Sequence, residues 1–301
     1  MKFNILTILI LLFEWVLCFD SKDEIYNEEE TRMLFELAAG TMLTNKTSCI
    51  SSSSKFPGDS RFVDGFEVTC DILTGSCSGY VVEIISKKQL VVAFRPTDTF
   101  FQFSAELFAA GFPDSNFYDI GEASFYFNQA FKTVWPMVKN ILTRQDFKNH
   151  DVYFIGHSLG GSIASLTSLA TIIEKVRKTN QVKVVTFGQP RTGNGDYVKY
   201  FNKIVKYSFR IINRGDVLAR APPCFKDMLN FETMRCDPFS NGPKHHKTEV
   251  WYPNGMKNGS KYVVCSDGEN DYCGNSYQID FHNFAGALMD HRKYFDKMIS
   301  P

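Results

Sequence analysis

The segment Asp151–Leu166, DVYFIGHSLGGSIASL, places a serine between glycines where two different patterns meet. The apolar run Val152–Ile155 is typical of a strand buried on both faces, and Ile163–Val176 has the pattern of a helix. Gly156–Gly160 fits G-x-S-x-G, which on a sharp strand-to-helix turn presents the serine oxygen as a nucleophile. The flanking positions are then glycine because side chains there would crowd neighbouring backbone. The alternative is that Ser158 only caps the helix.

A serine of ordinary pKa needs a neighbouring base to act as a nucleophile. In α/β-hydrolases an acid and then a histidine follow the serine along the chain. Asp216 comes directly after Tyr207–Asn213, a predicted buried strand, so its carboxylate is expected at the same sheet edge as Ser158. The histidines that follow Ser158 are His245, His246, His282 and His291.

The elements that must position these residues alternate between strands and helices. Val182–Gly188, VKVVTFG, is a further buried strand, and the order strand, helix, strand, helix, strand predicts an α/β sheet with helical crossovers. Two more strands joined by a polar turn at Ser86–Gln89 are expected within Gly79–Pro96. Helices are expected over Asn27–Met42 and Ala123–Thr143, with Pro136 kinking or breaking the second. The part beyond Pro222 is loop-rich, with one strand in TEVWYP, Thr248–Pro253.

The first 18 residues have the pattern of a secretory signal peptide: Lys2, then a mostly apolar run over Phe3–Phe13, with cleavage expected after Cys18. A membrane anchor is the alternative, but the run is too short to span a bilayer. The mature chain, residues 19–301, is then a single domain. Its net charge of zero argues against a nucleic-acid partner.

Seven cysteines remain after cleavage, and in a secreted chain they are expected to be mostly oxidised. Three local pairs suggest themselves, and Cys49 is left over: Cys70–Cys77, Cys224–Cys236 and Cys265–Cys273. Zinc is a poor alternative because no Cys-x-x-Cys pair exists. Asn45 and Asn258 fit the glycan acceptor pattern.

Five segments in a fixed order resemble motifs of the class 3, fungal-type triacylglycerol lipases, an α/β-hydrolase family, and in particular its secreted nematode members. They extend from about residue 90 to 295: VAFRPTDT, GHSLGG, FGQPRTGN, NRGDVLARAPP and DHRKYFD. The resemblance implies a predominantly parallel central sheet with flanking helices and a lid segment. It also implies a secreted serine hydrolase of lipid esters, a triacylglycerol lipase that forms an acyl-enzyme. The substrate would be met at a lipid–water interface, and no metal or cofactor is implied.

The resemblance also implies roles for single residues. Ser158 would be the nucleophile, Asp216 the acid and His291 the base, since His291 occupies the histidine of D-H-x-x-Y-F; His282, nine residues earlier, is its competitor. The backbone N–H groups of Leu159 and Thr97 would form the oxyanion hole. His245 and His246 are expected in a structural loop, and His157 is expected to pack beside the serine.

Two further features bear on activity. Pro96 stands where the family has glycine; it lacks an N–H and restrains Arg95 to an extended conformation. The segment after Thr97 matches the family's lid, and a flap that turns outward onto lipid would explain its large apolar residues, although they could instead belong to the core: Phe100, Phe101, Phe103, Leu107, Phe108 and Phe112. A non-catalytic lipid-binding protein and an esterase for soluble acyl esters are the alternative functions. A serine peptidase fits less well.

Overall fold

The computed structural model describes residues 25–43, 59–70, 76–96, 114–222, 224, 240–277 and 283–299. Its main element is an eight-stranded sheet with the order β1-β2-β3-β6-β7-β9-β11-β12. These strands are β1 (Ser60–Thr69), β2 (Ser76–Ile84), β3 (Gln89–Phe94), β6 (Asp151–His157), β7 (Val182–Phe187), β9 (Tyr207–Asn213), β11 (Glu249–Tyr252) and β12 (Val263–Cys265).

The five central strands, β3, β6, β7, β9 and β11, pair in parallel, whereas β1, β2 and β12 pair antiparallel at the two sides of the sheet. Because the carboxyl ends of parallel neighbours meet at one edge, residues that directly follow β6, β7 and β9 come together there. The predicted α/β architecture with a predominantly parallel sheet is confirmed.

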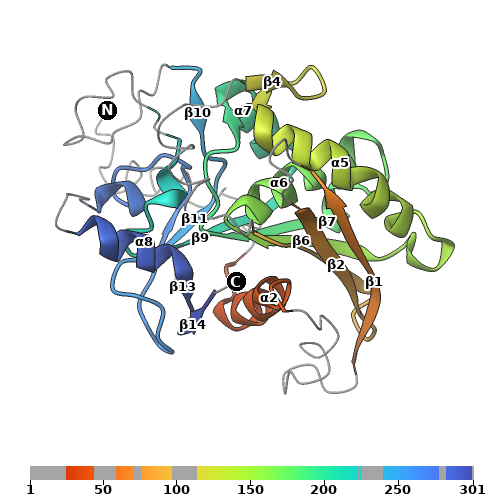
Figure 1. Cartoon of the computed structure of the whole chain (residues 1–301), viewed down its shortest axis with the longest axis horizontal. Coiled ribbons are helices and arrows are strands. Elements are labelled where there is room, and N and C mark those ends of the chain that lie inside the picture. Colours follow the sequence, from red (N-terminus) through yellow and green to blue (C-terminus); the bar gives the residue numbers. More distant parts are fainter. Residues whose placement is uncertain are drawn as a thin grey trace, which may run out of the picture.

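Both faces of the sheet are covered, and the side chains of each strand alternate between two cores. On β6, Val152 and Phe154 belong to the core under α5 (Phe125–Leu142), α6 (Leu159–Ile173) and α7 (Gly195–Ile204). Tyr153 and Ile155 point to the other core, formed with α2 (Glu28–Gly40) and with Tyr294, Phe295 and Ile299 near the C-terminus, where β13 (Lys293–Tyr294) pairs with the exposed strand β14 (Lys297–Met298). Figure 1 shows α2 and α5 on opposite faces of the sheet.

The predicted helices form, with one correction. The side chain of Asn27 caps α2 by accepting the N–H of Glu30 at 2.9 Å. Of the kink or break predicted at Pro136, the break is wrong, because α5 continues from Phe125 to Leu142 through it; the kink stays a prediction. Because proline has no N–H, the backbone carbonyl one turn earlier in α5 lacks its helical donor. Pro136 is exposed, so water can reach this carbonyl. The neighbouring Val134, Trp135 and Val138 are buried and hold both halves of the helix on the core.

Smaller elements complete the fold. A four-stranded sheet has the order β10-β8-β5-β4, from Pro243–Lys244, Gly193–Asn194, Glu122–Ser124 and Asp114–Asn116. The short helix α8 (Phe284–Arg292) precedes β13, and the 3-10 turns are η1 (Gln145–Phe147), η2 (Thr179–Gln181), η3 (Leu218–Arg220) and η4 (Gly274–Ser276). Within the described ranges, none of the helices combines the length and apolar character needed to span a bilayer.

Two of the three predicted disulfides are formed, Cys70–Cys77 and Cys265–Cys273. Cys224 is also disulfide-bonded, while Cys236 and Cys49 lie outside the described residues. Asn258 is exposed on a turn, as a glycan acceptor requires, and Asn45 lies outside the described residues.

Candidate active site

Ser158 lies on a sharp turn between β6 and α6, with φ 56° and ψ −127°. A residue other than glycine pays roughly 1–2 kcal/mol for a left-handed φ, so the surrounding structure must hold this conformation. Two backbone hydrogen bonds do so: the N–H of Ser158 donates to Phe187 O at 2.9 Å, and the N–H of Gly161 donates to Ser158 O at 2.9 Å. The predicted strand–turn–helix context is therefore present.

The glycines that flank Ser158 are required by close backbone contacts. A Cβ on Gly156 would lie 2.3 Å from the carbonyl oxygen of Gly160, and a Cβ on Gly160 would lie 2.4 Å from Phe94 O. The first turn of α6 thus packs directly against the end of β3, where the expected oxyanion segment begins. Leu159 is the first residue of α6 and is buried. Thr97, Phe100, Phe101, Phe103, Leu107, Phe108 and Phe112 lie outside the described residues.

Asp216 and His291 are joined directly, although 75 positions separate them in the chain. Nδ1 of His291 lies 2.7 Å from Oδ1 and 2.9 Å from Oδ2 of Asp216, and both side chains are fully buried. A carboxylate can only accept, so Nδ1–H of His291 donates; in the neutral form of the ring the lone pair is then on Nε2. Such a histidine is oriented as a general base.

Three more groups donate to the Asp216 carboxylate. The N–H groups of Leu218 and Ala219, at the start of η3, lie 3.0 and 3.1 Å from Oδ1, and the hydroxyl of Tyr294 lies 2.5 Å from Oδ2. Burial raises the pKa of Asp216, but His291, Tyr294 and the backbone donors outweigh burial and hold that pKa below its usual value. Burial, with Asp216 as neighbour, raises the pKa of Tyr294 well above normal, so its hydroxyl stays a donor.

The backbone around His291 is fixed from the ends of two strands. Nε2 of His157, the last residue of β6, donates to the carbonyl of His291 at 2.8 Å. Nδ2 of Asn213, the last residue of β9, donates to the carbonyls of Asp290 at 3.1 Å and Lys293 at 2.7 Å. The rings of His157 and His291 are 4.5 Å apart, so the residue before Ser158 is in contact with the histidine. Burial, then the charge of His291, lowers the pKa of His157 to about 3 and keeps its ring neutral.

Gly188 is a site residue that sequence reasoning missed. It follows β7 with φ +57°, and a Cβ there would lie 2.6 Å from Oδ2 of Asp216 and 2.9 Å from Nδ1 of His291. Asn213 and Tyr294 were missed as well. All three lie inside the quoted motifs FGQPRTGN, NRGDVLARAPP and DHRKYFD, and this was the available signal.

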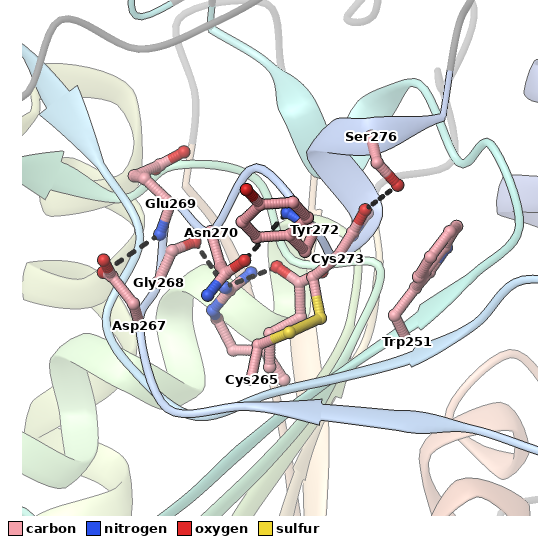
Figure 2. The surroundings of a disulfide bond; sticks show 12 residues. Trp251, Cys265, Asp267, Gly268, Glu269, Asn270, Tyr272, Cys273 and Ser276 are labelled. Atoms are coloured by element: carbon pink, nitrogen blue, oxygen red, sulfur yellow. Dashed lines mark hydrogen bonds and ion pairs between the residues drawn. A yellow bond between two sulfur atoms is a disulfide. The ribbon is translucent and has the colours of Figure 1, made fainter.

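The disulfide Cys265–Cys273 closes the loop that Figure 2 shows, and a buried ion pair ties this loop to the sheet. Arg210 of β9 donates to Oε2 of Glu249 on β11 at 3.0 Å and to Gly268 O at 3.0 Å. The N–H of Gly274, just past the loop, donates to the other oxygen of Glu249 at 2.7 Å. These bonds offset part of the cost of burying the two charges, although burial still raises the pKa of Glu249 and lowers that of Arg210.

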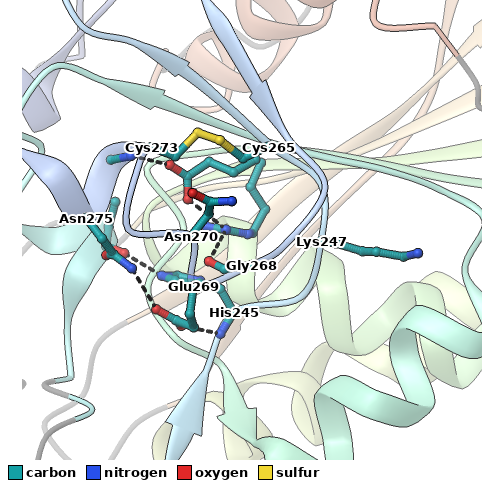
Figure 3. A network of polar contacts seen from close by, with 12 residues as sticks. His245, Lys247, Cys265, Gly268, Glu269, Asn270, Cys273 and Asn275 are labelled. Carbon is teal, nitrogen blue, oxygen red and sulfur yellow. Dashed lines mark hydrogen bonds and ion pairs between the residues drawn. A yellow bond between two sulfur atoms is a disulfide. The ribbon is translucent and has the colours of Figure 1, made fainter. Parts of the chain in front are cut away.

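A second network connects the same loop to the segment that contains Asp216. The Glu269 carboxylate accepts from Arg191 at 2.8 and 2.9 Å and from the N–H of His245 at 2.7 Å, as Figure 3 shows for His245. Arg191 also donates to the carbonyl of Arg220, and Arg220 donates to Gly274 O. The chain after Asp216 is thereby held on the C-terminal third.

The other histidines have structural surroundings. Nε2 of His245 donates to Ala219 O at 2.6 Å, and His246 stacks on Phe201 at 4.0 Å between ring centres. Burial lowers the pKa of His245 well below normal and that of His246 to about 3. His282 lies outside the described residues. Of the histidines that follow Ser158 in the described ranges, His291 is the one hydrogen-bonded to Asp216.

Comparison with known proteins identifies the family. The family model for Lipase (class 3) matches residues 91–226. A lipase of Caenorhabditis elegans is 34% identical over 306 residues, covering 98% of this chain and 87% of the relative. This chain belongs to the class 3 lipases. A lipase of Rhizopus niveus is 24% identical to this class 3 lipase over 259 residues, which cover 84% of this chain and 58% of that protein.

Solved structures share the fold of this class 3 lipase. Lipase II from Rhizopus niveus superposes with a TM-score of 0.69 at 20% identity, covering 91% of this chain and 97% of that one. A triacylglycerol lipase whose catalytic centre is described as a serine protease triad superposes with a TM-score of 0.69 at 19% identity. The match covers 91% of this chain and 97% of that one. The predicted α/β-hydrolase fold is confirmed, and as a class 3 lipase the chain is a carboxylic ester hydrolase that acts on lipid esters.

Proposed function

We propose that this class 3 lipase is a secreted triacylglycerol lipase that uses Ser158, His291 and Asp216 as its catalytic triad. The observation that supports this most strongly is the Asp216–His291 hydrogen bond at the sheet edge where Ser158 occupies its strained turn. His157 precedes Ser158 and holds the backbone of His291, so the nucleophile and the base belong to one hydrogen-bonded unit.

In the first half of the reaction, Ser158 Oγ forms a bond to the ester carbonyl carbon while its proton passes to Nε2 of His291. The imidazolium that results is stabilised by the buried Asp216 carboxylate. The tetrahedral intermediate then collapses, the carbon–oxygen bond to the alcohol breaks, and His291 returns the proton to the departing alcohol oxygen. The product of this half is an acyl-Ser158 enzyme.

In the second half, water takes the place of the alcohol and attacks the acyl carbon as His291 takes its proton. The bond from the acyl carbon to Ser158 Oγ then breaks, His291 returns the proton to Oγ, and the fatty acid leaves. The negative charge of each intermediate needs preorganised donors. Leu159 N–H at the start of α6 is the proposed first donor, aided by the positive end of this 15-residue helix. Thr97 remains the predicted second donor.

Secretion and the triglyceride substrate are supported by separate observations. The predicted signal peptide, the disulfides Cys70–Cys77 and Cys265–Cys273 and the exposed acceptor Asn258 fit an exported chain. One protein of the same fold is described as a triacylglycerol lipase. The large apolar residues after Thr97 fit a lid that opens on lipid.

The test is a chain-length series of esters, soluble and emulsified, on wild type, Ser158→Ala and Ser168→Ala. Ser168 is a matched control: it is also buried, and its hydroxyl bonds only within α6, to Ser165 O at 2.7 Å. Emulsified long-chain triglyceride should be hydrolysed by wild type and Ser168→Ala, and Ser158→Ala should lose at least ~10³-fold in rate.

Three results would contradict the proposal. Undiminished hydrolysis by Ser158→Ala would exclude the triad. Lipid binding without turnover by wild type would favour the non-catalytic alternative, in which Pro96 has altered the oxyanion segment. Hydrolysis confined to soluble short-chain esters would favour the esterase alternative.

A further inference from the structure

Two adjoining hollows lie at the sheet edge opposite Ser158, where β6, β7 and β9 begin. The larger, about 840 Å³, is lined by residues 148–149 before β6 and by residues 172 and 175–181 between α6 and β7. The smaller, about 380 Å³, is lined by residues 178–180, 182–183 and 206–207. Because Lys178, Thr179 and Asn180 line both, the two hollows adjoin along the amino ends of three strands and are together called the depression here.

The depression is strongly basic in a chain whose net charge is zero. Its linings contain five lysines, here called the lysine face, and no aspartate or glutamate: Lys148, Lys175, Lys178, Lys183 and Lys206. None of the five forms an ion pair with another described residue. Arg177, the sixth cation, is used internally: it donates to the carbonyls of His150, Leu142 and Phe147.

The carboxylates near the depression are engaged by other groups: Glu30 accepts from the Tyr207 hydroxyl at 3.3 Å and lies 4.0 Å from the ammonium of Lys87. Glu174, next to Lys175, is occupied by Lys139 at 2.6 Å and by the Trp135 ring N–H at 2.8 Å. Asp151, at the start of β6, interacts with Arg177. Burial lowers the pKa of Arg177, and the nearby charge of Asp151 raises it. The lysine face therefore attracts anions from solution.

Two of the lysines are held in place by the fold. Lys175 has φ 58° just after the end of α6, a position where glycine is the usual residue because a side chain costs about 1 kcal/mol there. The ammonium of Lys183 lies 4.8 Å above the centre of the Tyr207 ring and 5.1 Å above that of Tyr153. Such cation–π contacts limit the freedom of this side chain and present its charge at the depression.

We propose that the lysine face binds an extended sulfated polysaccharide. Five ammonium groups along the two adjoining hollows, with the polar side chains of Thr179, Asn180 and Gln181 also in their linings, match a chain of repeated anionic groups. A lipid bilayer fits poorly, because docking on this edge would turn the Ser158 edge away from the same membrane. A nucleic acid fits poorly because Tyr153 and Tyr207 are buried and cannot stack on bases. The charge argument is independent of the proposed lipase mechanism, while the choice of an extracellular polymer rests on the proposed secretion.

The experiment compares binding of heparin, as the sulfated probe, by wild type and two triple variants of the full mature chain at several salt concentrations. The lysine-face variant is Lys175→Gly, Lys178→Gln, Lys206→Gln; the glycine suits the left-handed φ at position 175. The control variant is Lys132→Gln, Lys199→Gln, Lys261→Gln, which removes the same charge from exposed lysines elsewhere.

Wild type and the control variant should bind heparin with similar affinity at 0.1 M salt, and the lysine-face variant about tenfold to hundredfold more weakly. The slope of log affinity against log salt should become shallower by about two in the lysine-face variant. Hydrolysis of a soluble ester should be unchanged, which shows that the variant is folded and separates this proposal from that of the triad.

Three outcomes would overturn the proposal. The first two are equal loss of heparin binding in both triple variants and the absence of salt-dependent heparin binding by wild type. The third is binding to vesicles of anionic phospholipid that is tighter than binding to heparin and that weakens in the lysine-face variant but not in the control variant. If Ser158→Ala abolished hydrolysis and kept heparin binding, both proposals would stand. If Ser158→Ala kept hydrolysis, only the triad would fall.

Discussion

Gly188 lies against the Asp216–His291 pair, so Gly188→Ala should disturb the candidate active site without removing any of its chemical groups. The added Cβ would lie 2.6 Å from Oδ2 of Asp216, whereas ordinary contacts begin at 3.4 Å, so the carboxylate would have to move by about 0.8 Å. Asp216 and His291 are fully buried, so this displacement is transmitted to the hydrogen bond between them. A displacement near 1 Å costs about 10²-fold in rate, or about 2.7 kcal/mol in the activation barrier.

Stability should fall as well. A left-handed φ costs alanine roughly 1–2 kcal/mol, and overpacking a buried site adds about 1–3 kcal/mol. The free energy of unfolding of Gly188→Ala should therefore decrease by about 2–5 kcal/mol. Urea denaturation at pH 7 measures this quantity, and kcat/KM on a soluble short-chain ester measures the effect on catalysis.

Gly259→Ala separates the two causes. Gly259 has φ +78°, and a Cβ there would meet nothing within 4 Å, so this variant has the backbone strain without the crowding. Its free energy of unfolding should fall by about 1–2 kcal/mol, and its kcat/KM should equal that of wild type. If Gly188→Ala kept the kcat/KM of wild type, or lost no more than Gly259→Ala, the placement of Gly188 against the triad would be refuted.

Two further predictions concern the same region. Tyr294→Phe removes one hydrogen bond to the Asp216 carboxylate, so the free energy of unfolding at pH 7 should fall by about 1.5–3 kcal/mol and kcat by roughly tenfold. Tyr252→Phe, which loses only the 2.8 Å bond to the Tyr26 hydroxyl, should keep kcat, and equal losses of kcat in the two variants would contradict the assignment. His157 and His246 have folded pKa values of about 3 against 6.5 unfolded, so between these values the unfolded chain binds more protons. Below pH 6.5 each of these two histidines should lower the free energy of unfolding by up to about 1.4 kcal/mol for every pH unit of acidification. Urea denaturation midpoints at pH 7, 6 and 5 measure this effect, and a midpoint that does not change with pH would refute the prediction.

The strands and most helices were predictable because their signals are local. Val152–Ile155 is a continuous apolar run, and Val182–Phe187 is apolar apart from Lys183 and Thr186, as is typical of strands buried on both faces; both strands lie at the centre of the sheet. The behaviour of Pro136 was not predictable. Whether proline breaks a helix depends on whether the unpaired carbonyl reaches water and whether its neighbours are held by packing, and both are tertiary properties.

Part of the site was predictable for the same reason. The glycines around Ser158 and the position of Asp216 after β9 are short-range patterns. The partner of Asp216 was less certain, because four histidines follow Ser158 and the residues alone did not choose among them. The predicted roles of Thr97 and of the lid remain predictions.

The sequence by itself determined the alternation of strands and helices, the strained turn at Ser158 and the family, because each is encoded in neighbouring residues. Only the tertiary structure decided that His291 reaches Asp216 across 75 positions, that Gly188 must lack a side chain, and that His157 and Asn213 hold the histidine backbone. It also gathered five lysines from three separate segments at the far edge of the sheet. The physical reason is that such contacts depend on which strands are neighbours and in what register, and the pairing of strands is a property of the whole sheet.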